Sequence, residues 1–370
     1  MRFIVSSGLL LKNLQSISGI ISNNTILPIL ESFLFVIENN TLTVVSTDLE
    51  TTMKVNLEVQ SESNGKLCIQ SKVLLDYLKN LPEQPITFDI NSEDYGVDIT
   101  SEQGKYKVVA EDAANYPTEP VADDTTSFKM SAAELTDGIA KTIIAVSADD
   151  MRPAMSGVFF DMSENALTMV ATDAHRLVRC TKTDIQFASH SNFIAPRKAL
   201  QQLKNNLQSS TEVTLSYNVN HLFVKSENLE LSCRLIDAKF PDYKVVIPAD
   251  NPFKLTLNKI EFLSALRRVS VFSNKTTKQV VLDIVGNNLH LYAQDVDYSF
   301  EGNEQMSCQY KGEDMKIAFN SQLLIELIGV VDGEEVLMEF STPSRAGLIK
   351  QVETKPNEDL LILIMPLMIG

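Results

Sequence analysis

Residues 33–48 read FLFVIENNTLTVVSTD, and the pattern returns as VFFDMSENALTMVATD at residues 158–173 and as VVLDIVGNNLHLYAQD at residues 280–295. In each copy, two runs rich in β-branched and aromatic residues flank a short segment containing asparagine or glycine. These residues adopt left-handed backbone easily, so each copy is predicted to form a β-hairpin. Each copy ends in an aspartate whose carboxylate we expect to cap the following turn. The three aspartates are Asp48, Asp173 and Asp295.

Two further features repeat in register with the hairpin. A short strand pattern begins at Phe3, Phe128 and Phe253, at intervals of 125 residues, and apolar residues of helical period follow each one. A second helix is predicted at residues 72–81, 197–207 and 320–331. The period is far longer than that of a solenoid repeat, so each copy is predicted to be a whole domain. The expected fold class is α+β, with two helices packed on antiparallel sheets in each of three tandem domains. The expected boundaries are 1–124, 125–249 and 250–370.

The charge of the chain is strongly acidic but unevenly placed. Among 370 residues, 32 lysines and arginines stand against 48 aspartates and glutamates, which gives a formal net charge of −16. A chain this acidic should repel nucleic acid, so any DNA binding requires a local reversal of sign. The six predicted helices hold ten basic and five acidic residues. The helices therefore offer such a reversal.

No motif in the sequence indicates catalysis, a metal site or a cofactor. The four cysteines, Cys68, Cys180, Cys233 and Cys308, form no CxxC pair and suit a reduced cytosol. Phosphate-loop, dinucleotide-loop and nucleophile-elbow motifs are missing, and the four histidines lack metal-ligand spacing. No apolar run reaches the ~18 residues of a membrane span. The first strand and helix belong to a repeat, so we expect a folded unit there rather than an export signal.

Over its whole length the sequence resembles the bacterial DNA sliding clamp family, the beta subunit of DNA polymerase III. The resemblance rests on the three repeats, on ATDAHRL at residues 171–177, on FPDY at residues 240–243 and on the apolar MPL at residues 365–367. It implies a non-catalytic head-to-tail homodimer whose six domains form a ring around double-stranded DNA, with the helices lining the hole. It also implies a bacterial cytoplasmic protein, associated with the nucleoid during replication. Its partners would be the replicative DNA polymerase, the clamp loader and repair polymerases, all bound through short linear peptides.

The residues expected to line the hole are basic residues of the helices and one loop arginine. They are Arg197, Lys198, Lys204, Arg267, Arg268, Arg152, Lys12, Lys72, Lys79 and Lys141. The alternative for each is a solvated helix face. The family often has aromatic and amide residues in the Arg152 loop, where this chain has Asp149, Asp150 and Met151, and it commonly has an arginine near Asn24. For the closing edges of the ring, the resemblance implies Tyr106 and Val108 at one end and Val271 and Phe272 at the other. Tyr106 and Val108 could instead face their own core.

The resemblance also implies a peptide-binding pocket between the second and third domains. Its residues are Met155, Thr172, Ala174, His175, Arg176, Leu177, Pro241, Val245, Val246, Asn320, Leu323, Ser344, Leu363, Ile364, Met365, Pro366 and Leu367. Methionine thioethers adapt to varied apolar partners, which suits a protein with several ligands. Leu323 replaces a common pocket aromatic, and the Met368-Ile369-Gly370 end replaces an arginine before a terminal leucine, so the peptide preference is expected to differ. His175 could instead be a hydrogen-bonded structural histidine, and Met155 and Leu177 could be interior core.

Two other functions fit parts of the sequence. Asp173 and His175 resemble half of a catalytic arrangement, but no nucleophile motif accompanies them. An acidic scaffold that binds proteins and not DNA would keep the repeats and the pocket without the hole. Retention on circular but not on linear DNA would separate a clamp from such a scaffold.

Overall fold

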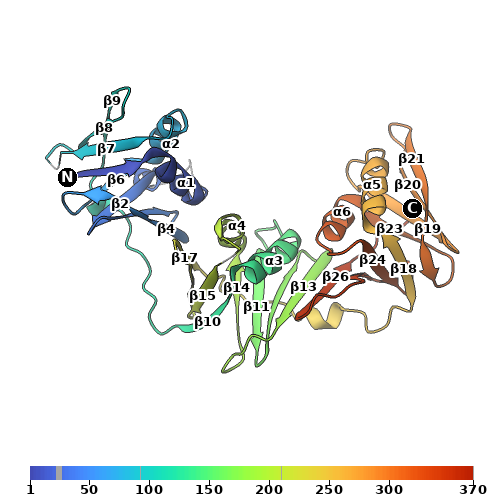
Figure 1. Cartoon of the computed structure of the whole chain (residues 1–370). Helices are drawn as coiled ribbons and strands as arrows, with labels where there is room; N and C mark the ends of the chain where they lie inside the picture. The colour runs from blue at the N-terminus through green and yellow to red at the C-terminus, as the bar shows by residue number, and fades with distance from the viewer. Residues whose placement is uncertain (22–26, 92, 210, 370) are drawn as a thin grey trace. The chain divides into compact units, whose positions relative to one another are not determined.

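The computed structural model describes residues 1–21, 27–91, 93–209 and 211–369, so Asn24 and Gly370 lie outside the described residues. Each repeat holds two helices on antiparallel strands (Figure 1). The first repeat comprises β1 (Arg2–Ser6), α1 (Ser7–Ser18), β2 (Ser32–Glu38), β3 (Thr41–Thr47), β4 (Thr51–Glu58), β5 (Gln60–Ser61), β6 (Gly65–Gln70), α2 (Ser71–Lys79), β7 (Pro85–Ile90), β8 (Gly96–Thr100) and β9 (Lys105–Val109).

The second and third repeats follow the same order. The second comprises β10 (Thr126–Ser131), α3 (Ala132–Thr142), β11 (Gly157–Ser163), β12 (Ala166–Thr172), β13 (Arg176–Thr183), β14 (Ser191–Pro196), α4 (Arg197–Asn206), β15 (Glu212–Tyr217), β16 (His221–Lys225) and β17 (Leu229–Arg234). The third comprises β18 (Phe253–Asn258), α5 (Lys259–Ser270), β19 (Gln279–Val285), β20 (Asn288–Asp295), β21 (Phe300–Ser307), β22 (Gln309–Lys311), β23 (Met315–Asn320), α6 (Ser321–Gly329), β24 (Glu335–Phe340), β25 (Gly347–Gln351) and β26 (Glu358–Ile364).

The predicted hairpins and second helices are confirmed. The hairpins are β2–β3, β11–β12 and β19–β20, each paired antiparallel across its turn. Asn39 and Asn40 in the first turn and Gly286 in the third have positive φ, as the turn chemistry requires. The second helices α2, α4 and α6 match the predicted ranges within two residues at each end.

The predicted turn capping is also confirmed. Oδ1 of Asp48 accepts hydrogen bonds from the backbone N–H groups of Glu50 (3.1 Å) and Thr51 (2.7 Å). Oδ1 of Asp173 accepts from residues 175 and 176, both at 2.9 Å, in the same way. Asp295 accepts from the N–H of residue 297 at 3.1 Å. These carboxylates are occupied by backbone donors, which favours a structural role for them.

The chain forms two compact units, residues 1–136 with 195–235, and residues 137–194 with 236–370. The division runs through the second repeat because its strands extend the sheets of both neighbours. In the first unit β17 pairs with β4, and the sheet runs β10-β15-β16-β17-β4-β3-β2-β6. In the second unit β13 pairs with β26, and the sheet runs β14-β11-β12-β13-β26-β25-β24-β18-β22. Each unit therefore contains a junction where two repeats share one continuous sheet.

Each unit also has a smaller sheet that ends in an open edge. The first unit has the order β5-β1-β7-β8-β9, and the second has β21-β20-β19-β23. β9 and β21 are therefore edge strands. Neither strand has a hydrogen-bonded neighbour on its outer side within the described residues.

The helices pack on the sheets through apolar faces of helical period. In α1, Leu10, Leu14 and Ile17 are buried, and the Ser6 hydroxyl caps the first turn by accepting from the N–H of Leu9 (3.3 Å). α1 lies on β3 and β4 with α2 and α4 beside it, and α4 contacts β17. In the second unit α5 lies against α6 (Figure 1). The polar faces of these helices are left exposed and carry most of the predicted lining residues.

Candidate functional sites

Several of the predicted lining residues are exposed cations without a counter-charge. Lys12 on α1, Lys72 on α2 and Arg197 on α4 are exposed in the first unit, and Arg267 on α5 is exposed in the second. Lys204 on α4 is half-buried. Within the described residues none of the five forms an ion pair. Their charge is therefore available to an external anion.

Two of the predicted lining cations, Lys198 and Arg268, already bond to acidic partners within the protein. The Lys198 ammonium donates to the carbonyl oxygen of Ile20 (2.9 Å) and pairs with Asp48 (2.5 Å). The Arg268 guanidinium donates through Nε and Nη2 to both carboxylate oxygens of Glu304 (2.7 and 2.6 Å). These hydrogen bonds hold the pKa of Glu304 below its ordinary value. A fork of this kind satisfies the geometry of the guanidinium, so Arg268 has less to offer a phosphate.

Two other predicted lining cations, Arg152 and Lys79, are also paired with near neighbours. Arg152 lies 3.1 Å from Asp149, and Lys79 lies 3.6 Å from Asp76. All four side chains are substantially exposed, so these pairs exchange readily with water or ligand. In the Arg152 loop the neighbouring Met151 is fully open to solvent.

The prediction that Lys141 lines the hole is wrong. Lys141 is only 3% exposed, and its ammonium contacts the carboxylates of Asp137 (2.9 Å), Asp332 (2.7 Å) and Glu358 (2.6 Å). The Lys182 ammonium joins the same group by bonding to Asp137 and Glu358. Burial acts to lower the pKa of Lys141, but the hydrogen bonds to these carboxylates raise it above its ordinary value. The side chain runs into the protein because its counter-charges lie there.

The turn of the predicted peptide pocket is held by its own polar groups. The Thr172 hydroxyl donates to the carbonyl oxygen of Arg176 (2.7 Å) and accepts from the N–H of Ala174 (3.2 Å), whose φ is 75°. The buried Arg176 guanidinium bonds to Asp173 (3.0 Å) and to Glu326 on α6 (2.6 Å). Arg176 thus ties the turn to the third repeat. It acts as a structural ion pair in addition to any role in binding.

The His175 side chain is exposed and forms no hydrogen bond within the described residues. Its backbone supports the turn instead, because its N–H donates to Asp173 and its carbonyl oxygen accepts from the N–H of Met365 (2.8 Å). The alternative of a hydrogen-bonded structural histidine therefore does not hold. The imidazole is free to meet a ligand.

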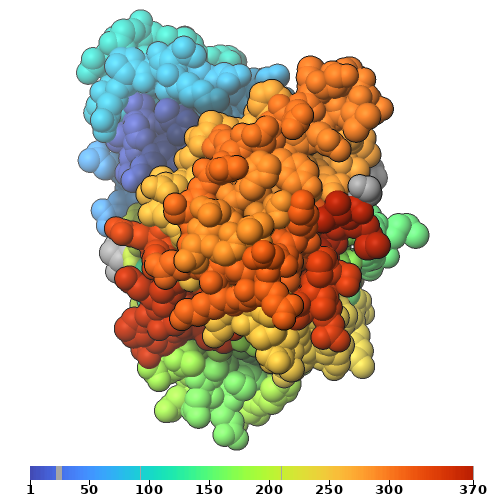
Figure 2. Space-filling model, turned by 90° about the vertical axis from the view of Figure 1, so that its right-hand side faces the viewer, coloured from blue at the N-terminus to red at the C-terminus, as the bar shows by residue number. Residues whose placement is uncertain are grey.

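The C-terminal segment, which belongs to the third repeat, bonds first to β13 of the second repeat and then to β23 of the third. Ile364 pairs with Arg176 and Leu363 with Leu177 along β26 and β13. Beyond β26, the N–H of Leu367 donates to the carbonyl oxygen of Ala318 on β23 (2.8 Å). Met365 is 41% exposed and Met368 more so, and the end of the chain lies at the surface of the second unit (Figure 2). The tail is thus fixed by backbone bonds while its apolar side chains stay accessible.

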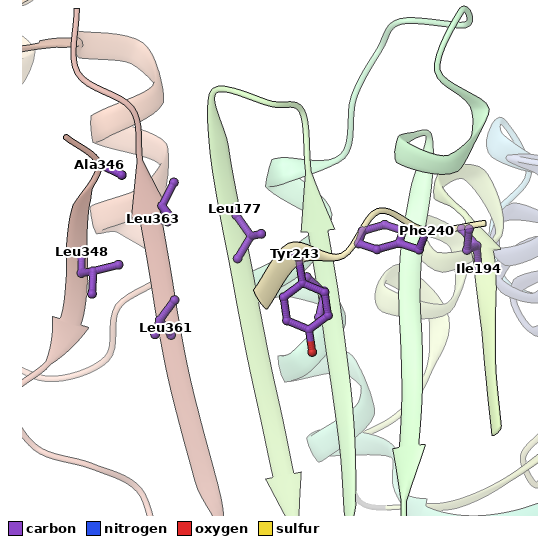
Figure 3. Close-up of a cluster of buried hydrophobic side chains, with 9 residues drawn as sticks. Leu177, Ile194, Phe240, Tyr243, Ala346, Leu348, Leu361 and Leu363 are labelled. Carbon is purple, nitrogen blue, oxygen red and sulfur yellow. The ribbon is translucent and has the colours of Figure 1, made fainter. Parts of the chain in front are cut away.

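A buried apolar cluster lies beneath this surface (Figure 3). Leu177, Phe240, Tyr243, Leu361 and Leu363 belong to it, and they come from β13, β26 and the 240–243 segment. The interior-core alternative therefore holds for Leu177, and the buried Leu363 and Ile364 are also core rather than contact residues. Leu361 was missed by the sequence analysis. Phe240 and Tyr243 lay within the quoted FPDY motif without being assigned a role.

The remaining predicted pocket residues lie in the same unit as this cluster. Val245 and Val246 are exposed on a short helical turn, Tyr243–Val246, which the Asp242 carboxylate caps through the N–H of Lys244 (3.2 Å). Pro241 and Ser344 are exposed, whereas Pro366, Leu367, Leu323 and Met155 are half-buried. Asn320 caps α6 by accepting from the N–H of Leu323 (3.1 Å), so it positions that leucine.

The predicted closing edges lie on or beside the two open edge strands. Tyr106 and Val108 are on β9, and the Tyr106 ring packs on Tyr77 of α2 with centroids 4.6 Å apart while remaining 43% exposed. Val271 and Phe272 are exposed just after α5. Phe272 covers Gly302 of β21, where a Cβ would lie 2.6 Å from its ring. β21 itself was not among the residues predicted for this edge.

Within the described residues no cluster of three or more His, Cys, Asp or Glu side chains could hold a metal ion. Nor does any of the described helices have the length and apolar character needed to span a membrane.

Comparison with known proteins covers nearly the whole chain. Models of the DNA polymerase III beta subunit match in order: the N-terminal domain at residues 1–120, the central domain at 129–242 and the C-terminal domain at 244–368. The beta sliding clamp of Haemophilus influenzae is 29% identical over 373 residues, with 99% of this chain and 100% of that protein covered. The beta sliding clamp of Pseudomonas aeruginosa is 26% identical, with the same coverage.

Solved structures agree in fold. A sliding clamp from Pseudomonas aeruginosa bound to griselimycin superimposes with a TM-score of 0.93 at 24% identity, and one from Bacillus subtilis with 0.93 at 22%. Both comparisons cover 100% of each chain.

Proposed function

Because the chain belongs to the DNA polymerase III beta subunit family, the non-catalytic sliding clamps, we propose that two copies form a ring around duplex DNA and tether the polymerase to it. The observation that carries this proposal is the match of three consecutive family domains to residues 1–368. We take the domains as 1–124, 125–249 and 250–370, each one copy of the repeat. The proposed role places the protein in the bacterial cytoplasm, on the nucleoid during replication.

The charge distribution supports DNA as the partner. The exposed and unpaired cations Lys12, Lys72, Arg197 and Arg267 all lie on helices of a chain whose net charge is −16. Lysine and arginine contacts to phosphate carry no sequence information, and each one that forms releases counterions. A small number of such contacts suits a protein that must move along DNA. The acidic remainder would repel the duplex from other surfaces.

The open edges support a head-to-tail dimer. A free edge strand is a template for pairing with another chain. β9 carries the exposed Lys107, β21 carries the exposed Glu301, and the two strands lie at different ends of the sequence. A contact between unlike ends is heterologous, and it forms a closed ring when the rotation from one copy to the next divides the full circle. We propose that Tyr106 and Val108 of one copy meet Val271 and Phe272 of the other across this pairing.

The surface above the buried apolar cluster supports a site for short linear peptides. It offers the free His175 imidazole, the exposed Val245 and Val246, and the tail residues Met365 and Leu367. These groups are apolar or aromatic and rest on a fixed backbone, so they bind ligands without first being ordered. We propose that the polymerase, the clamp loader and repair polymerases dock here. Leu323 leaves more room than an aromatic side chain would, which favours bulky apolar peptide residues.

Two measurements test the proposal. Light scattering should give twice the chain mass of 41.1 kDa. After loading by a clamp loader with ATP, the protein should stay on a nicked circular plasmid through gel filtration and leave it once the plasmid is cut. Equal retention on the circular and the linear plasmid would contradict encirclement. A peptide-binding dimer with no retention on either form would favour the acidic scaffold.

A further inference from the structure

The two repeat junctions are built on one plan. The pairing of β4 with β17 sets Thr51 opposite Cys233, and the pairing of β13 with β26 sets Arg176 opposite Ile364. The residue after each pair forms an equivalent hydrogen bond. The N–H of Arg234 donates to the carbonyl oxygen of Glu50, and the N–H of Met365 donates to the carbonyl oxygen of His175, both at 2.8 Å. The helices correspond as well, because α1 and α3 begin 125 residues apart. Positions in one junction can therefore be compared with positions in the other.

The second junction is filled by charges. Between its helices and strands lie the ammonium groups of Lys141 and Lys182 and the carboxylates of Asp137, Glu358 and Asp332. Lys141, Lys182 and Glu358 are almost fully buried. Each of these five groups lies against at least one opposite charge.

The first junction has a cavity at the corresponding place. Lys12 stands where the second junction has Asp137, Ser16 where it has Lys141, and Glu227 where it has Glu358. The long buried lysine is thus replaced by a serine, and the half-buried anion Asp137 by an exposed cation. A cavity of about 620 Å³ opens between α1, the end of α4 and the β16–β17 turn.

The lining of this cavity is rich in unused hydrogen-bond donors. The side-chain amides of Gln15, Gln208 and Asn228 form no hydrogen bonds within the described residues, and Asn205 uses only its oxygen, which accepts from Gln201 (2.9 Å). Lys12 adds one ammonium, and the buried Val55, Leu207 and Leu229 form an apolar floor. Glu227 on the β16–β17 turn is the single carboxylate of the lining.

We propose that this cavity holds one sugar–phosphate unit of the DNA that the protein encircles. Lys12 and the amides of Gln15, Asn205 and Gln208 donate to the phosphate oxygens, and the apolar floor contacts the sugar. Glu227 repels the phosphate from its own side and so confines it near Lys12. The proposal rests on the function proposed above and adds where and by what chemistry the backbone is held.

One observation and two general properties of its donors favour DNA over a protein segment as the occupant. The cavity lies between α1 and α4, the helices that carry the exposed Lys12 and Arg197. Amide and ammonium donors are among the usual groups that contact DNA phosphates. A neutral amide also displaces no counterion, so a contact built mostly from amides forms and breaks with little salt dependence. That property suits a site over which a DNA backbone must slide.

The test is the affinity of the dimer for a short fluorescein-labelled duplex, measured by anisotropy across a range of salt concentrations. The double variant Asn205→Ala/Gln208→Ala should bind roughly fivefold more weakly at each salt concentration with an unchanged salt slope. Lys12→Ala should lower the slope by about 0.9. Glu227→Gln should bind more tightly, a gain that misfolding cannot produce. The matched control, Asn115→Ala/Asn220→Ala, removes two exposed amides of the same unit outside the cavity and should bind as the wild type does.

The outcomes distinguish a failure of the cavity proposal from a failure of the proposed function. If the wild type binds the duplex and stays on circular DNA while the cavity variants all match the control, the cavity does not hold DNA. The same result is expected if the cavity serves a protein partner instead. If the wild type itself neither binds the duplex nor stays on circular DNA, the proposed function fails together with this inference.

Discussion

Replacing Lys141 by methionine tests whether the buried charges hold the second junction together. Methionine keeps an unbranched apolar stem of similar length, so the change removes the ammonium and little else. The ammonium lies 2.6 to 2.9 Å from three carboxylates, of which the Glu358 side chain is only 2% exposed. After the change, Lys182 and Lys355 remain to balance Asp137, Asp332 and Glu358, so one negative charge is left without a partner.

The expected loss in the free energy of unfolding is about 3 kcal/mol, the low end of the range for breaking a buried pair, because Lys182 still contacts Glu358. For a unit of this size, that corresponds to a melting temperature roughly 6–12 °C lower. The matched control is Lys355→Met. Lys355 contacts Asp332 at 2.8 Å, but its side chain is 47% exposed, so its loss should cost less than about 1 kcal/mol.

The assay is calorimetric melting of the two variants and of the double variant Lys141→Met/Glu358→Gln. The second change removes the unpaired charge, so the double variant should melt above Lys141→Met. Equal melting of Lys141→Met and Lys355→Met would refute the reasoning. A double variant that melts below Lys141→Met would refute it too, because it would mean that the unpaired negative charge does not lie on Glu358.

The same network predicts how stability depends on pH. Burial alone would raise the pKa of Asp137, but the hydrogen bonds from Lys182 and Lys141 lower it below its ordinary value. A carboxylate with a depressed folded pKa contributes stability above its unfolded pKa of about 3.9, and that stability is lost as the pH falls through the folded value. The raised pKa of Lys141 contributes stability below about pH 10.4 that is lost at higher pH. Lys141→Met should therefore lose less stability than the wild type on acidification below about pH 4.

Two further predictions concern the proposed contacts. Arg197→Glu should weaken duplex binding and lower its salt slope by roughly one to two units, because this exposed arginine forms no ion pair within the described residues. Lys198→Glu should instead mainly lower the melting temperature by breaking the contact with Asp48. An unchanged slope in Arg197→Glu alongside a normal melt would place that residue outside the DNA contact. Deleting residues 365–370 should reduce the affinity for an apolar polymerase-type peptide by orders of magnitude and leave the dimer intact, since the lost side chains contribute about 1–3 kcal/mol each when a ligand buries them. Fluorescence anisotropy and light scattering measure the two effects; full peptide binding would contradict the assigned site, and loss of both would mean that the tail is an ordinary closing strand.

The parts of the fold that depend on neighbouring residues were predictable from the sequence. The hairpins follow from alternating β-rich runs around an asparagine or glycine turn, and the helices follow from apolar spacing. The capping by Asp48 and Asp173 involves donors only two and three residues away. Three copies in register strengthened each of these inferences. A pattern that appears once is ambiguous, whereas one that returns at 125 residues is not.

Pairings between distant residues could not be predicted in this way. Lys141 pairs with Glu358, which is 217 residues away in the sequence, and Lys198 pairs with Asp48, which is 150 residues away. Counting charges along a helix treats each cation as free, so it overstated the basic surface by including both. The β4–β17 and β13–β26 pairings join neighbouring repeats into one sheet, and no local sequence pattern indicated them. Whether a lysine faces a ligand or a partner carboxylate depends on these distant contacts.

The peptide site was located by resemblance, and the structure assigns its residues to different tasks. Leu177, Leu363 and Ile364 are buried, while Met365, Val245 and His175 are accessible. Alternation along a strand would have assigned this division wrongly, because residues 363 and 365 would share one face. The strand β26 ends at Ile364 with its last five residues all buried, and the exposed Met365 follows in an irregular tail. The sequence shows where the motif lies, but the partner strand and the tail bonds decide which of its side chains a ligand can reach.

The two junctions use corresponding positions in opposite ways. Position 12 is a lysine directed outward, and its counterpart, Asp137, is a carboxylate that accepts from two buried lysines. The second junction pairs its charges internally and buries Lys141, Lys182 and Glu358. The first junction leaves its cation and amides unpaired and retains a cavity among basic helices. At the position shared by residues 16 and 141, a serine in one junction and a long lysine in the other separate these two arrangements. If the cavity holds DNA as proposed, the choice between self-pairing and ligand binding depends on very few residues.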